Sequence, residues 1–172
     1  MSPDKDDSDN GLEEGKDSSS LMPRGDVMPR ASGQIMRQGY SATELNALYS
    51  LSRVFLESGE IATAERVARG IISVEPDFID AWLIVAYVAL MREDLDEAIY
   101  SAKKVLTLKD SSLEGLLFLV IAHFQLNDFQ TGGTYLGEVS DRIAVERARP
   151  ELRRLYDAQV IRFEERLRSG AS

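Results

Sequence analysis

Cysteine is absent from the 172 residues, and the chain has a single histidine and a single tryptophan. Without cysteine there is no disulfide framework and no thiolate chemistry, which fits a reducing cytosol. One histidine cannot build a His/Cys zinc site. Basic residues number 20 against 29 acidic ones, for a net charge of −9 at pH 7. This acidity argues against nucleic acid or an anionic membrane as the partner.

Long hydrophobic runs are also absent. The longest apolar run is 81–91, which is too short to span a bilayer. The first residues are acidic and have no apolar core, so they do not form a secretory signal, and we expect a cytoplasmic protein without membrane insertion. Residues 1–40 are rich in Asp, Ser, Gly and Pro and poor in aliphatic side chains. We therefore predict that they form a disordered acidic N-terminal arm.

Beyond position 40 the sequence repeats itself every 34 residues, as the spacing of Leu48, Trp82 and Leu116 shows. Apolar and small residues return at the same places three times. The recurring sets are Leu48, Trp82 and Leu116; Leu51, Val85 and Leu119; Ala64, Ala98 and Gly132; Ala68, Ala102 and Leu136; and Ile71, Val105 and Val139. This period and pattern resemble the tetratricopeptide repeat (TPR), a helix–turn–helix unit that stacks into a solenoid. The resemblance implies an all-α fold, a right-handed superhelical stack of three TPR units.

The predicted units are 45–78, 79–112 and 113–146, preceded by a capping box at Ser41–Glu44. Turn residues fall between the two helices of each unit, at 58–59, 93–94 and 127–128. Residues 94–97 and 111–114 have the pattern of further capping boxes. Pro150 is placed to open another helix, with apolar residues at helical spacing up to Leu167. We expect 147–168 to be a C-terminal capping helix that seals the last unit.

The first helix of each TPR unit lines the concave side of the stack. The inward positions define a predicted peptide-binding groove with an apolar and aromatic floor. We assign to it Tyr49, Arg53, Leu56, Leu83, Tyr87, Leu90, Met91, Leu117, Ile121 and Phe124. The segment 81–91 supports this assignment independently, because a helix that is apolar all round must be covered all round. An exposed remainder of that surface indicates an interaction site.

Two interpretations of that surface stay open. A partner peptide fills the groove, which Tyr87 and Met91 favour because tyrosine offers area with a polar tip and methionine adapts to varied ligands. In the other interpretation, the C-terminal helix or a second copy of the chain covers it, so that a homodimer is left open. The TPR clamp for a terminal carboxylate is not expected, because its basic positions hold Tyr49, Arg53, Ile84, Glu114 and Phe118 here.

The chain offers no constellation for catalysis, and we predict no enzymatic activity and no catalytic, metal or cofactor site. His123 falls on a core position of the third unit, with no orienting acid beside it at helical spacing. The glycines at 132, 133 and 137 lack the order and the preceding strand of a phosphate loop. They are expected to allow close approach between helices.

Three TPR units, a polar arm and one extra helix together resemble the class II translocator chaperones of bacterial type III secretion, of the SycD/LcrH kind. Residues 45–51 with 58–59 are similar to the start of that family's first repeat, and 141–144 with 150–152 to the junction into its last helix. The resemblance implies a chaperone that holds an extended, hydrophobic segment of a translocator in the concave groove. Alternatives are a TPR adaptor in a multiprotein assembly, such as a needle-subunit chaperone complex, and an accessory subunit of an enzyme.

Overall fold

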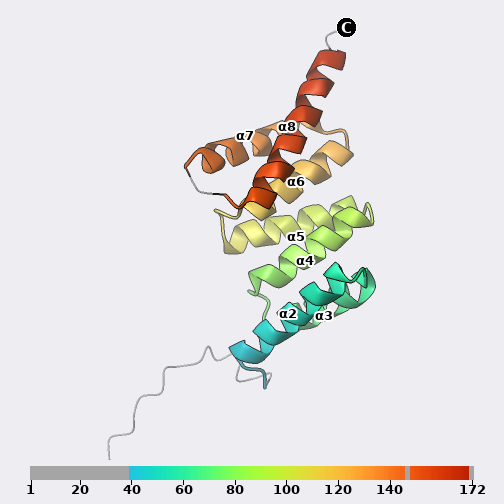
Figure 1. The fold of residues 1–172 in the computed structure, drawn as a ribbon, viewed down its shortest axis with the longest axis vertical. Helices are drawn as coiled ribbons and strands as arrows, with labels where there is room; N and C mark the ends of the chain where they lie inside the picture. The colour runs from blue at the N-terminus through green and yellow to red at the C-terminus, as the bar shows by residue number, and fades with distance from the viewer. Residues whose placement is uncertain (1–38, 146–147, 171–172) are drawn as a thin grey trace, which may run out of the picture. The chain divides into compact units, whose positions relative to one another are not determined.

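The computed structural model describes residues 39–145 and 148–170, and the regular structure within them is entirely helical (Figure 1). The helices are α2 (Ala42–Glu57), α3 (Ile61–Val74), α4 (Ile79–Met91), α5 (Leu95–Leu108), α6 (Leu113–Gln125), α7 (Phe129–Val145) and α8 (Pro150–Gly170). The predicted all-α class is confirmed. The predicted disordered arm, residues 1–40, lies outside the described residues apart from its last two.

The helices pair in chain order, as a TPR stack requires. Each helix contacts the next one, and the alternate helices α2, α4, α6 and α8 form a row in which each member contacts its neighbour. The antiparallel pairs are therefore α2–α3, α4–α5 and α6–α7, with α8 placed where a fourth pair would begin (Figure 1). This is the predicted TPR-like stack with a C-terminal capping helix. The predicted first boundary, at residue 45, falls inside α2.

Local signals set most helix ends. The Ser41 hydroxyl accepts a hydrogen bond from the Glu44 N–H at 3.2 Å, and the Glu44 carboxylate accepts one from the Ser41 N–H at 2.7 Å, which completes the predicted capping box. The turns between paired helices contain left-handed residues: Gly59 at φ +84°, and Glu93 and Asn127 at φ +60°.

The other two predicted capping boxes are only partly correct. Asp94 accepts the Glu97 N–H at 3.2 Å as expected. At α6 the capping side chain is Ser112, which accepts the Gly115 N–H, so this helix starts one residue later than the predicted box.

Small residues let the paired helices approach closely. Ala64 and Ala68 of α3, and Ala98 and Ala102 of α5, are fully buried. These positions recur from one repeat unit to the next, so the periodicity marks the seam between paired helices. A Cβ on Gly132 would lie 2.5 Å from the Phe124 ring, which confirms that this glycine is needed for close approach in the third pair.

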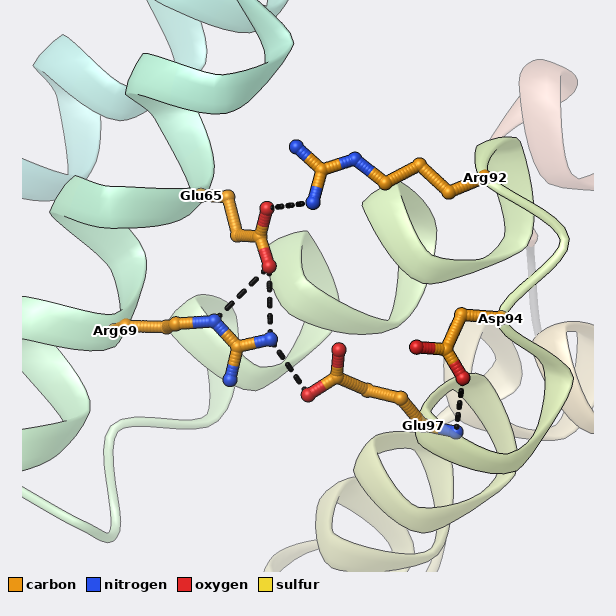
Figure 2. A network of polar contacts seen from close by, with 5 residues as sticks. All are labelled: Glu65, Arg69, Arg92, Asp94 and Glu97. Atoms are coloured by element: carbon orange, nitrogen blue, oxygen red, sulfur yellow. Dashed lines mark hydrogen bonds and ion pairs between the residues drawn. The ribbon is translucent and has the colours of Figure 1, made fainter.

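A polar cluster joins the first pair to the second (Figure 2). The Glu65 carboxylate, whose side chain is 12% exposed, accepts hydrogen bonds from Arg69 at 2.8 and 3.0 Å and from Arg92 at the end of α4. Arg69 also donates to Glu97 of α5 at 2.6 Å. Two carboxylates and two guanidinium groups therefore satisfy one another across the junction.

Candidate functional site

The concave row of α2, α4 and α6 contains two adjoining hollows. The first, about 630 Å³, is called the polar hollow and is lined by Tyr49, Arg53, Leu56, Glu57, Tyr87, Arg149 and Glu151. The second, about 290 Å³, is called the apolar hollow and is lined by Tyr87, Leu90, Met91, Phe118, Ile121, Gln125 and Leu155. Tyr87 belongs to both, so the two hollows form one groove that passes over this side chain.

Seven of the ten predicted groove residues line these hollows: Tyr49, Arg53, Leu56, Tyr87, Leu90, Met91 and Ile121. Leu83 is half-buried and lines neither. Leu117 and Phe124 are fully buried, so the structure leaves them out of the groove.

The burial of Leu117 and Phe124 has a clear cause in α8. Both belong to a core cluster against which Leu155, Tyr156 and Phe163 of this helix pack. Arg162 of α8 also donates a hydrogen bond to the Phe124 carbonyl at 3.1 Å, near the end of α6. The C-terminal helix therefore covers the concave face of the third pair, and the groove is confined to the first two pairs and the near edge of α6.

Helix α4 is apolar on every side, and most of its apolar side chains are buried within the stack itself. Val85 and Val88 pack against α3, and Ala86 and Ala89 pack toward α5 and α6. The expectation that this helix needs an external cover is thus too broad. What remains in solvent is a stripe with Tyr87, 42% exposed, and Met91, 54% exposed.

Charges in the polar hollow are balanced. Arg53 pairs with Glu57 at 3.2 Å, and Arg149 pairs with Glu114 beside the hollow. Burial raises the pKa of the Tyr49 phenol, and the nearby Asp80 carboxylate raises it further. This hydroxyl therefore stays neutral at physiological pH. A site with equal and paired charges offers little net attraction to a charged ligand, so shape and apolar contact must dominate recognition.

The apolar hollow is built from three helices. Tyr87 of α4 lies against Phe118 of α6, with ring centroids 6.4 Å apart. Leu155 of α8 closes one side. A hollow of this size and lining can take one or two aliphatic side chains of an extended segment.

Sequence reasoning missed the part of the groove that comes from the last helix and its approach. Arg149, Glu151 and Leu155 line the hollows but were assigned to the capping region. The amphipathic stripe of 152–167 signals a packed helix, yet it does not show that the first turn of that helix reaches the groove.

His123 differs from expectation. Its Nδ1 lies 3.1 Å from an Asp128 carboxylate oxygen, so an orienting acid is present after all. A tight turn after α6 reverses the direction of the chain. Asp128, five positions after His123, therefore lies beside the last turn of α6. The buried Nε2 has no hydrogen-bond partner among the described residues.

Other chemistry is limited in the described ranges. Residues 39–145 and 148–170 contain no group of three His, Cys, Asp or Glu side chains that could hold a metal ion. Among the helices that the structure describes, none is long and apolar enough to cross a membrane.

Paired helices stacked in chain order and closed by a capping helix define a TPR-like class of fold. No family model matches the chain, and no curated protein matches it in sequence. Solved structures do match. SycD, the translocator chaperone of type III secretion in Yersinia enterocolitica, is 17% identical, with a TM-score of 0.65 over 73% of this chain and 96% of SycD.

Two further neighbours extend the comparison. PcrH, solved in complex with the chaperone binding region of PopB, is 16% identical, with a TM-score of 0.64 over 70% of this chain and 98% of PcrH. An O-GlcNAc transferase from Thermobaculum terrenum matches at 17% identity and a TM-score of 0.57, over 59% of this chain but only 19% of the transferase. The described fold is thus that of the TPR-like type III secretion chaperones, while identities this low establish the fold alone.

Proposed function

We propose that this chain is a bacterial cytoplasmic chaperone that holds an extended, hydrophobic segment of a type III secretion translocator in its concave groove. The observation that carries the proposal is the pair of hollows that share Tyr87. Such a groove suits a segment without secondary structure, whose side chains enter successive pockets. Support also comes from SycD, which was solved with a peptide of the translocator YopD, and from PcrH, which was solved with the chaperone binding region of PopB.

The energetics favour apolar anchors. Each Leu-sized side chain that leaves water for the groove contributes on the order of 1.5–3 kcal/mol. Two or three anchors offset the cost of ordering a short segment and leave an affinity in the micromolar range. Since Arg53 and Arg149 are already paired with carboxylates, binding should resist added salt.

Co-expression with the translocator subunits of the same genome tests the proposal. A subunit that is insoluble alone should become soluble and co-purify with the chain. Tyr87→Asp should abolish capture, because it places a charge between the two hollows, while the far-UV helical signal stays unchanged. Tyr100→Asp is a matched control, since Tyr100 is a 56% exposed tyrosine on α5 that lines neither hollow.

The outcomes separate the alternatives. Capture that survives Tyr87→Asp would show that the groove assignment is wrong. A chain that fails to solubilise any translocator but joins a stable multiprotein assembly would be an adaptor instead. A chain that alters the turnover of an enzyme would be an accessory subunit.

A further inference from the structure

The start of α8 forms a second wall of the groove. Arg149 and Glu151, at the first turn of this helix, line the polar hollow together with side chains of α2 and α4. Leu155, one turn further on, lines the apolar hollow. Burial raises the pKa of the Tyr49 phenol of α2, and the positive charge of Arg149 is near enough to lower it in part. A segment held in the groove therefore lies between α2 on one side and the first turns of α8 on the other.

Another hollow lies on the opposite side of the same turn. It has a volume of about 170 Å³, and its lining includes Lys109, Leu113, Glu114, Arg149 and Leu152. We call it the rear hollow. Arg149 lines both the polar hollow and the rear hollow, so the first turn of α8 stands between two spaces that side chains do not fill. Close packing would leave no such spaces, and the turn therefore has room to move away from the groove.

The later part of α8 is packed tightly. The Phe163 ring lies parallel to that of Phe124, and Arg162 donates a hydrogen bond to the Phe124 carbonyl at 3.1 Å. A Cβ on Gly133 of α7 would lie 2.9 Å from the Phe163 ring, so little space remains there. One turn before Phe163, the buried amide oxygen of Gln159 has no hydrogen-bond partner among the described residues, which weakens the middle of the contact. The hold on α8 thus declines from Phe163 toward the first turn.

An ion pair keeps the first turn in place. The Arg149 guanidinium donates to the Glu114 carboxylate in the first turn of α6, 35 positions earlier in the chain. Leu152 and Leu155 pack on the core beside this pair but stay partly exposed. The Glu114 side chain is 24% exposed and that of Arg149 is 68% exposed, so water competes for both charges. An ion pair of this exposure is weak enough to break and re-form in thermal motion.

We infer that the first turn of α8 is a movable wall of the groove, and that the Arg149–Glu114 ion pair is the contact that holds this wall closed. When the pair breaks, the turn moves into the rear hollow while the stacked Phe163 keeps the rest of the helix in place. The groove then widens, and a bound segment can enter or leave. Arg149 and Glu114 are thus positioning residues that set the width of the groove. The inference rests on the proposed function for what occupies the groove, but the movement itself needs no ligand.

The absence of cysteine allows the movement to be measured in the full chain without a ligand. Spin labels on Ser50→Cys of α2 and Arg154→Cys of α8, both exposed positions, report the width of the groove by double electron–electron resonance. We expect a main distance and a longer, less populated one. Labels on Ser50→Cys and Glu165→Cys are the reference pair, because Glu165 is exposed and follows the packed Phe163. The reference pair should give one distance.

Breaking the ion pair should open the wall. Glu114→Gln should raise the longer-distance population by a factor of about two to five, which is the contribution of an ion pair of this exposure. Glu164→Gln is the matched control, because it removes an ion pair with Arg168 on the same helix and should leave both populations unchanged. The double variant with Glu114→Arg and Arg149→Glu rebuilds the pair with reversed charges and should restore the wild-type ratio.

Dissociation kinetics connect the movement with the groove. Since a captured translocator segment leaves when the wall is open, its dissociation rate in Glu114→Gln should rise by the same factor of about two to five. In Glu164→Gln the rate should stay unchanged. A chain that captures no translocator but shows the two label distances, with their response to Glu114→Gln, would contradict the proposed function and still support the movable wall. The two proposals can therefore fail separately.

Three results would overturn the inference. The first is a single distance for the labels at Ser50 and Arg154 that Glu114→Gln leaves unchanged, which would show that the first turn is fixed. The second is a longer-distance population that the charge-reversed double variant does not reduce, which would show that Arg149 and Glu114 do not act as a pair. The third is a longer distance that also appears for the reference pair at Glu165, which would mean that the whole of α8 detaches.

Discussion

Phe163 of α8 stacks on Phe124 of α6 with the two ring planes 1° apart and the centroids 5.7 Å apart. Phe124 stacks on Phe129 of α7 as well, at 5.0 Å. One fully buried ring thus connects the last pair to the capping helix. Offset aromatic pairs of this kind add to the energy of burial.

Removing the capping ring should therefore loosen the end of the stack. Phe163→Ala should lower the free energy of unfolding by about 2–4 kcal/mol, because it deletes a large, partly buried side chain and leaves a cavity over Phe124. Denaturant unfolding followed by far-UV circular dichroism measures the change. Ile161→Ala, at an exposed site on the same helix, should change stability by less than about 0.5 kcal/mol. Equal losses in the two variants would contradict this role for the stacked rings.

Two glycines of α7 provide a sharper contrast. Gly132→Ala should lower the free energy of unfolding by about 1–3 kcal/mol, since the new Cβ would meet the Phe124 ring at 2.5 Å. At Gly137 a Cβ would meet nothing within 4 Å. Gly137→Ala should therefore stabilise the helix by about 0.5–1 kcal/mol, because alanine loses less backbone entropy on folding. Melting temperatures that move in the same direction in both variants would show that packing at Gly132 is not as tight as the structure has it.

These contrasts also show what sequence could predict. The repeat period located the buried alanines and the turns, because the same helix seam must recur in each unit. Seven of the ten residues that it predicts for the groove line the two hollows, and their role in binding stays a prediction. The period does not indicate that Leu117 and Phe124 are buried, because their repeat positions face inward in all units but meet α8 only in the last one. The path of α8 depends on how the chain turns after α7, and a helical stripe does not encode that direction.

The ionic cluster around Glu65 should fix the junction between the first and second pairs (Figure 2). Glu65→Ala would leave Arg69 and Arg92 without their shared acceptor. Because those arginines are 46% and 47% exposed, solvent limits the loss in the free energy of unfolding, which we expect to be about 1–3 kcal/mol. Denaturant unfolding measures it.

A surface pair is the control for that prediction. Glu57→Gln removes the partner of Arg53, but both side chains are more than half exposed, at 68% and 58%. It should cost less than about 0.5 kcal/mol. In 1 M salt, the difference between wild type and Glu65→Ala should shrink, since charge contributes to it. A difference that salt leaves unchanged would indicate that Glu65 acts through packing alone.

Asp128 should give stability a dependence on acidic pH. Hydrogen bonds from Thr131, first from its side chain and then from its backbone N–H, lower the pKa of this carboxyl, and His123 lowers it further. A folded-state pKa below the unfolded value near 4 means that the carboxylate stabilises the fold above that pH. The contribution is lost as the pH falls from about 4 through the folded pKa.

Asp128→Asn keeps a capping side chain at the start of α7 but removes the charge. Melting temperatures of the variant should therefore be lower than those of the wild type between pH 5 and 7, and the two curves should converge once the pH falls below the folded-state pKa of Asp128. A gap that persists at low pH would show that the amide disturbs the cap itself and that the charge of Asp128 is not the cause.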